Sequence, residues 1–154
     1  MKKIDLIDHR ILRTLKGQGY ISNAKLCEII GLSASQCWQR VQRLEKAGYI
    51  KGYHADIDQR LLGYADIVLV DIAAERNTTS DINELCMELS RIPEVLEVHL
   101  TSGEFDCFIK VAVDGTQGFE HFLSNRLRQV KGIRNSRSSF SLKCFKNEIC
   151  FIPE

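Results

Sequence analysis

The chain has 154 residues, of which 44% are hydrophobic and 27% charged, with only two prolines. This composition fits one ordinary domain or two very small ones, and it excludes a disordered chain. No stretch approaches the roughly 18 apolar residues that a membrane span requires, and no long apolar run follows the N-terminal lysines. We therefore expect a soluble, cytoplasmic protein with no membrane partner.

The net charge of +1 hides an asymmetry between two parts of the sequence. Residues 1–52 contain ten Lys and Arg against four Asp and Glu, a net charge of +6. Residues 53–154 contain eleven against sixteen, a net charge of −5. A basic first third joined to an acidic remainder is typical of a domain that binds a polyanion and a body with another task.

The cysteines indicate no metal site. No two of the six have the two-residue separation typical of zinc chelation, and all lie within apolar patterns, where a thiol behaves as a small hydrophobe. We therefore expect a protein with neither a cofactor nor a metal. Its reduced structural thiols are Cys27, Cys37, Cys86, Cys107, Cys144 and Cys150.

The first third predicts three helices. Apolar residues at helical spacing predict the first over residues 5–15, ended by Gly17 and Gly19. A second, capped by Ser22 or Asn23, runs through Ile30.

The segment Gly31-Leu32-Ser33 then forms a tight turn, in which Leu32 fills the core and Ser33 caps the next helix. That third helix runs from Ala34 or Ser35 to Ala47, and a strand-like segment follows over residues 49–57.

The rest of the chain alternates strands with helices. Helices are expected over residues 81–92 and around 119–130. The strands expected before, between and after them cover residues 65–72, 95–100, 105–113, 138–145 and 148–152. The strands at 95–100 and 105–113 form a hairpin, and the order β-α-β-β-α-β is the ferredoxin-like arrangement. The predicted fold class is therefore α+β, with a winged helix-turn-helix followed by a ferredoxin-like domain.

The third helix has two different faces. Cys37, Val41 and Leu44 lie on one side and face inward. Trp38 fits either packing against the first helix or a position on the side of the DNA backbone, and we expect it to pack in the core. Glutamine and arginine suit base edges, so the base-reading candidates are Gln36, Gln39, Arg40 and Arg43. The other candidates for DNA contact, several of them to phosphates, are Ser22, Asn23, Ser33, Ser35, Lys46 and Lys51. Taken alone, this face also fits a merely solvated helix, but its neighbours fit a winged helix-turn-helix that enters the major groove.

Several motifs resemble the Lrp/AsnC (feast/famine) family of bacterial and archaeal transcription regulators. The matching segments are Asp8-x-Arg10-Ile11-Leu12, Ile21-Ser22-Asn23, Gly31-Leu32-Ser33, the run from Cys37 to Tyr53, Leu100 to Asp106, and Gly132-Ile133-x-x-Ser136-x-Ser138. They cover nearly the whole chain in order. The resemblance implies a DNA-binding regulator, modulated by a small effector that is an amino acid, with a winged helix-turn-helix over residues 1–53, a hinge over 54–64 and a ligand-binding and dimerisation domain over 65–154.

The resemblance also implies assembly. Pairing two copies sheet to sheet would cover the exposed sheet and set two recognition helices about one helical turn of DNA apart. Members of this family dimerise in that way, often form tetramers or octamers, and bind amino acids between dimers. Their effector motif, Gly-x-x-Asp-Tyr, is here Gly103 to Cys107, with Cys107 in place of tyrosine. The implied effector residues are Thr101, Ser102, Gly103, Glu104, Asp106, Ser136 and Ser138.

Three alternatives stay open. One is a ligand-independent architectural DNA-binding protein of the same fold. Another is an enzyme with Cys107, His99 and Asp106 as nucleophile, base and orienting group, although no second motif supports catalysis. The last is a purely structural or RNA-binding adaptor, although the body lacks the aromatic strand motif that stacks bases.

Overall fold

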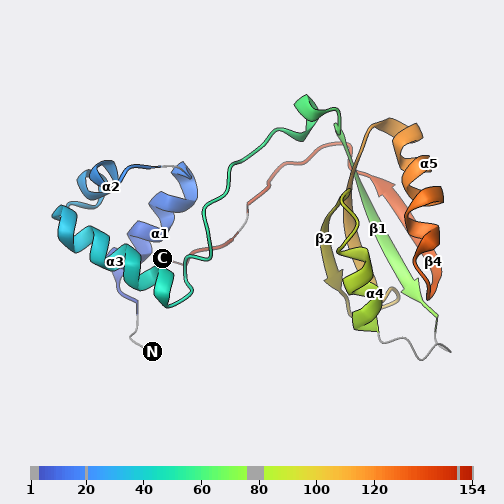
Figure 1. Ribbon diagram of the computed structural model, residues 1–154, viewed down its shortest axis with the longest axis horizontal. Coiled ribbons are helices and arrows are strands. Elements are labelled where there is room, and N and C mark those ends of the chain that lie inside the picture. Colours follow the sequence, from blue (N-terminus) through green and yellow to red (C-terminus); the bar gives the residue numbers. More distant parts are fainter. Residues whose placement is uncertain (1–3, 20, 76–81, 149, 154) are drawn as a thin grey trace. The chain divides into compact units, whose positions relative to one another are not determined.

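Two units make up the chain, and the computed structural model describes residues 4–19, 21–75, 82–148 and 150–153 (Figure 1). The first unit, here the head unit, comprises Met1–Ile57 together with Lys146–Glu154. The second, the body unit, comprises Asp58–Phe145. Each unit has its own cluster of buried apolar side chains, so each is described by itself.

The head unit contains the three predicted helices, α1 (Leu6–Gln18), α2 (Asn23–Ile30) and α3 (Ala34–Lys46). α2 ends at Gly31, whose φ of 78° is left-handed backbone that glycine adopts at little cost. Each helix begins behind a side chain that accepts a hydrogen bond from its first turn, namely Asp5, Ser22 and Ser33.

The core of the head unit lies where the three helices meet. Leu32 packs half-buried against this core, as predicted. The prediction that Trp38 packs in the core is wrong, because its side chain is 56% exposed. Cys37 faces the core, and one step along a helix turns the next side chain by about 100°, which carries Trp38 out of the buried stripe. The buried members of this core are Ile11, Leu26, Cys27, Ile30, Cys37 and Leu44.

The strand expected over residues 49–57 is absent from the described chain, which has no regular structure there. A strand requires a hydrogen-bonded neighbour, and the head unit pairs none with this segment. Tyr53 contacts α3 instead, because its hydroxyl donates to Glu45 Oε1 at 2.9 Å. A short 3-10 helix, η1 (Gln59–Leu62), follows in the body unit.

The C-terminal residues of the head unit lie along α1. The carbonyl of Pro153 accepts from Arg13 Nη2 at 2.6 Å and lies 3.0 Å from His9 Nδ1. Lys16 forms an ion pair with Glu148. Two positive side chains of α1 are therefore bound to the end of the chain.

The body unit has the expected order of elements: β1 (Asp66–Ala74), α4 (Ile82–Leu89), β2 (Val95–Leu100), β3 (Cys107–Val113), α5 (Gly115–Asn125), η2 (Leu127–Gln129) and β4 (Ile133–Phe140). Its four strands form one antiparallel sheet in the order β2-β3-β1-β4. Alternate residues of β1 and β3 pack under α4 and α5, and they form the core with Leu85, Leu89, Phe119 and Phe122. This is the ferredoxin-like fold that the sequence predicts.

The end of the chain differs from the expected strands at 138–145 and 148–152. β4 ends at Phe140, and no strand follows in residues 141–148 or 150–153. Phe140 pairs with Val68, only two residues from the start of β1, so the neighbouring strand has almost no backbone left to bond. Cys144 and Cys150 are consequently exposed rather than packed among apolar residues.

Candidate nucleic-acid interface

The polar face of α3 gathers the four predicted base-reading residues around one shallow hollow. Ser33 orients the start of this helix, because its hydroxyl accepts from Gln36 N and donates to Gln36 Oε1 at 3.0 Å. Cys37 and Leu44 fix the opposite face in the core. The hollow, of about 440 Å³, is lined by Leu32, Gln36, Gln39, Arg40 and Arg43.

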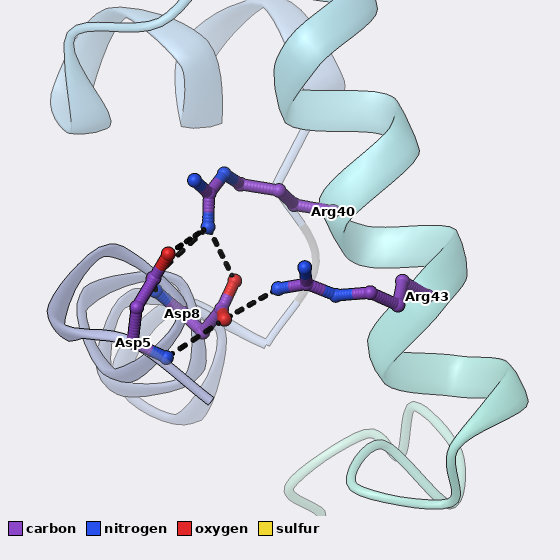
Figure 2. Close-up of polar contacts among 4 residues, drawn as sticks. All are labelled: Asp5, Asp8, Arg40 and Arg43. Atoms are coloured by element: carbon purple, nitrogen blue, oxygen red, sulfur yellow. Dashed lines mark hydrogen bonds and ion pairs between the residues drawn. The ribbon is translucent and has the colours of Figure 1, made fainter. Parts of the chain in front are cut away.

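Two of these residues are bonded to acids at the start of α1 (Figure 2). Arg40 Nη1 donates to both carboxylate oxygens of Asp5, at 2.9 and 2.7 Å, and to Asp8 Oδ1 at 2.8 Å. Arg43 Nη2 donates to Asp8 Oδ2. The arginines lie about one turn apart on α3, so the acid pair joins α1 and α3 by charge.

The two acids also support each other through the helix backbone. Asp5 Oδ1 accepts from Asp8 N at 2.9 Å, and Asp8 Oδ2 accepts from Asp5 N at 3.0 Å, which is a capping box. Asp8 is fully buried, whereas the side chain of Asp5 is 50% exposed. One acid is thus part of the core, and the other lies at its rim.

The contact between Asp5 and Arg40 shifts the pKa of both side chains. The hydrogen bond from Arg40, helped by the backbone N–H of Asp8, lowers the pKa of Asp5 to about 2. The same contacts, with Asp5 first and Asp8 second, raise the pKa of Arg40 above its usual value. Both members of the pair therefore carry full charge at neutral pH.

Sequence reasoning did not identify Asp5 and Asp8 as part of this site. The signal was present, because Asp8 falls at helical spacing with Ile11 and Leu15 on the apolar stripe of α1. An acid in a buried stripe requires a cationic partner, and the polar face of α3 supplies two.

The other predicted DNA contacts differ in how far they are already engaged. Ser22 caps α2 by accepting from Lys25 N at 3.3 Å, and Asn23 is the first residue of that helix. Ser35 Oγ lies 3.4 Å from Ser33 Oγ. Within residues 4–19, 21–75, 82–148 and 150–153, no hydrogen bond or ion pair engages Gln39, Lys46 or Lys51. These three side chains are available to a ligand.

The turn that holds most of the predicted effector residues lies at one end of the body sheet. Thr101 Oγ1 donates to the carbonyl of Phe105 at 2.8 Å, which closes the turn that holds Ser102, Gly103 and Glu104. Gly103 has a φ of 140°, a conformation that strains other residues. Asp106 ties this turn to β1, because its Oδ2 accepts from Ala74 N at 2.8 Å.

Ser136 and Ser138 lie across β1 from that turn. Ile72 pairs with Cys107 on one side and with Ser136 on the other, and Val70 pairs with Ser138. Ser136 is half-buried and Ser138 exposed. The sheet therefore places Asp106, just before β3, and the two serines of β4 on opposite sides of β1, and the Asp106 carboxylate already has a backbone partner.

Cys107 is not arranged for catalysis with His99. Cys107 is fully buried, 3.5 Å from Cys86 Sγ of α4 on the helix-covered face, and burial raises its pKa to about 12. His99 contacts Glu97 and Phe108 instead, and more than half of its side chain is exposed. A nucleophile needs an accessible thiolate and a base within hydrogen-bond distance, and Cys107 has neither.

Neither a metal-binding cluster nor a membrane-spanning helix occurs among the described residues. No group of three or more His, Cys, Asp or Glu among them is arranged to hold a metal ion. No helix in the same residues combines the length and the apolar character needed to cross a membrane.

Comparisons with known proteins match both units. A family described as "Lrp/AsnC ligand binding domain" matches residues 67–149, and one described as "Winged helix-turn-helix DNA-binding" matches residues 4–51. The leucine-responsive regulatory protein of Escherichia coli is 33% identical over 137 residues, which cover 89% of this chain and 84% of that protein.

Solved structures agree with these matches. A transcriptional regulator from Neisseria meningitidis in complex with L-Met has a TM-score of 0.89 and 26% identity, and covers 96% of this chain and 95% of its own. A feast or famine regulatory protein from M. tuberculosis complexed with L-methionine has a TM-score of 0.87 and 28% identity, over 98% and 100% of the two chains.

Proposed function

This chain belongs to the Lrp/AsnC family of transcription regulators, and from that premise we propose which residues bind DNA and which bind an effector. The α3 face of the head unit contacts base edges in the major groove, and a small effector, an amino acid, binds to the body unit and modulates this contact. A regulator of this kind acts on DNA within the cytoplasm.

The observation that carries the DNA proposal is the polar hollow on α3 and the position of Gln39 within it. Gln39 has no bonding partner among the described residues, and glutamine matches the adenine edge with two hydrogen bonds. Lys46, at the last position of α3, and Lys51, beyond its end, supply the positive charge that phosphate contacts require. The +6 charge of residues 1–52 supports the same conclusion.

Selection from random DNA tests this proposal directly. The purified chain is used to enrich duplexes of about 30 base pairs, long enough for two half-sites one turn apart. The Kd for the enriched duplex and for its scrambled version is then measured by fluorescence anisotropy across a potassium chloride series. We expect tighter binding to the enriched duplex at every salt concentration. Equal Kd values for both duplexes throughout the series would contradict sequence-selective binding.

Gln39→Ala refines this test, because the substitution leaves the charge of the interface unchanged. It is expected to reduce the preference for the enriched duplex about fivefold or more while binding to the scrambled duplex stays the same. Gln42→Ala is a matched control on the same helix, since Gln42 bonds Glu45 and lies outside the hollow.

An amino acid as effector is supported by two neighbours whose structures contain L-Met. The candidate contacts are the backbone around Gly103, together with Thr101, Ser102, Glu104, Asp106, Ser136 and Ser138. Calorimetric titration of the chain with each of the twenty amino acids tests this. We expect at least one amino acid to give binding heat with the wild-type chain and none with Gly103→Val. If no amino acid gives heat with the wild-type chain, the ligand-independent architectural alternative is favoured.

Homodimerisation is supported by the open face of the body sheet. α4 and α5 cover one face, and the opposite face carries half-buried Leu69 and Phe108 beside the ion pair of Asp71 with Arg137. Pairing two such faces would cover this apolar surface and unite two α3 helices on one site. Sedimentation velocity is expected to give a dimer, tetramer or octamer, and a monomer at micromolar concentration would contradict this.

A further inference from the structure

We infer that Asp5 is a positioning residue that holds Arg40 away from DNA, so that DNA must displace this carboxylate, whereas Arg43 stays bound to Asp8. The inference rests on the proposed DNA-binding function. It assigns different roles to two arginines that the sequence places in one group.

The geometry around Arg40 makes its contact with Asp5 replaceable. A single nitrogen, Nη1, serves all three acceptor atoms, two of Asp5 and one of Asp8. The Nε and Nη2 atoms of Arg40 make no hydrogen bond within the described residues, and Arg40 borders the hollow on α3. A phosphate or a guanine edge that enters the hollow would therefore find two unused donors on the same guanidinium.

The two acids differ in what happens to each when a cation leaves. Asp5 is half exposed, so water can solvate its carboxylate once Arg40 has turned away, at small cost. Asp8 is fully buried, so it requires at least one bound cation to offset the loss of hydration. Arg43 supplies that cation independently of Arg40. Loss of the arginine therefore costs little free energy at Asp5 and much more at Asp8.

Charge adds to this asymmetry on the side that faces DNA. With Arg40 bonded to both acids and Arg43 to Asp8, the cluster is close to neutral, and an approaching phosphate meets the exposed carboxylate of Asp5. Removing that carboxylate would free Arg40 and end the repulsion. Asp5 is thus expected to weaken DNA binding and to act through Arg40.

Asp5→Asn is a clean test, because asparagine caps a helix as well as aspartate does and keeps the bond to Asp8 N. Asp5→Ser repeats the test with another capping side chain. Each is combined with Arg40→Met, which keeps the aliphatic stem and removes the charge. The matched control is Asp56→Asn, which removes one exposed negative charge from the head unit at a residue with no bonded cation among the described residues. Thermal melting establishes that each variant is folded.

The readout is the Kd for the enriched duplex in the four members of the cycle. Asp5→Asn is expected to tighten binding about two- to fivefold, the range for one partly exposed ion pair, and to change nothing when Arg40 is already methionine. An equal gain in both backgrounds, or the same gain in Asp56→Asn, would show a general charge effect and overturn the inference while leaving the proposed function intact. Failure of the wild-type chain to prefer the enriched duplex would instead contradict the proposed function, and the inference with it.

Discussion

Arg43→Met is expected to lower the free energy of unfolding of the head unit by about 3 kcal/mol. Asp8 is fully buried and accepts from Arg43, from Arg40 and from the backbone of Asp5. Removing one partner of a buried ion pair typically costs about 3–5 kcal/mol, because a charge is left without compensation. The expected value lies at the lower end, since Arg40 still contacts Asp8 in this variant.

Urea unfolding followed by tryptophan fluorescence measures this loss in the head unit alone. Trp38 is the only tryptophan of the chain and lies on α3. A unit of this size has a urea dependence of about 1–2 kcal/mol per molar, so the midpoint is expected to fall by about 1.5–3 M. Glu28→Gln, which removes one acid from an exposed ion pair of α2, serves as the control and is expected to change stability by less than about 0.5 kcal/mol.

A double variant separates the charge from the packing. In Asp8→Leu with Arg43→Met, the buried acid and its cation are both replaced by apolar groups, and most of the lost stability is expected to return. A loss below about 0.5 kcal/mol in Arg43→Met would refute the buried-pair reasoning. A double variant as unstable as Arg43→Met would attribute the loss to the packing of the arginine stem.

Three further predictions concern individual side chains. The pKa of Asp5 falls from 3.8 to about 2 on folding, so the pair with Arg40 stabilises the head unit above about pH 4 and this contribution is lost as the pH falls towards 2. Between pH 5 and 2, the urea midpoint is therefore expected to decrease less steeply in Asp5→Asn than in the wild type. Cys107 is buried and has a pKa of about 12, so iodoacetamide is expected to leave it unmodified in the native chain while exposed Cys144 and Cys150 react. Peptide mass mapping measures this, and rapid labelling of Cys107 would contradict its burial. Burial, followed by the bond to Glu45, raises the pKa of Tyr53 to about 12, so a spectroscopic titration should show one tyrosine ionising last in the wild type and earlier in Glu45→Gln.

Local signals predicted the helices of the head unit and the order of elements in the body unit. Ser22 and Ser33 cap the helices they precede, Gly31 ends α2, and the hairpin of β2 and β3 forms as expected. Such features depend on residues a few positions apart, and the sequence therefore contains them explicitly.

Features that depend on distant partners were not predictable in the same way. The segment at 49–57 has β-like composition but no neighbouring strand, and residues beyond Phe140 find no more of β1 to pair with. Arg40 and Arg43 have the composition of base readers, yet their partners lie some 32–35 positions away at the start of α1. The sequence shows that a buried charge requires a partner of opposite charge, but only the tertiary structure shows which residue is that partner.

The attachment of α3 to α1 through Asp8 also affects how a protein of this fold can change its DNA target sequence during evolution. The orientation of α3 is set by a buried acid and by core residues, so substitution of Gln39 alters the surface that we propose contacts DNA without altering the position of the helix. Descendants of such a protein can acquire new operator sequences one side chain at a time. Arg43 is expected to remain unchanged among them, as the residue that the helix itself requires.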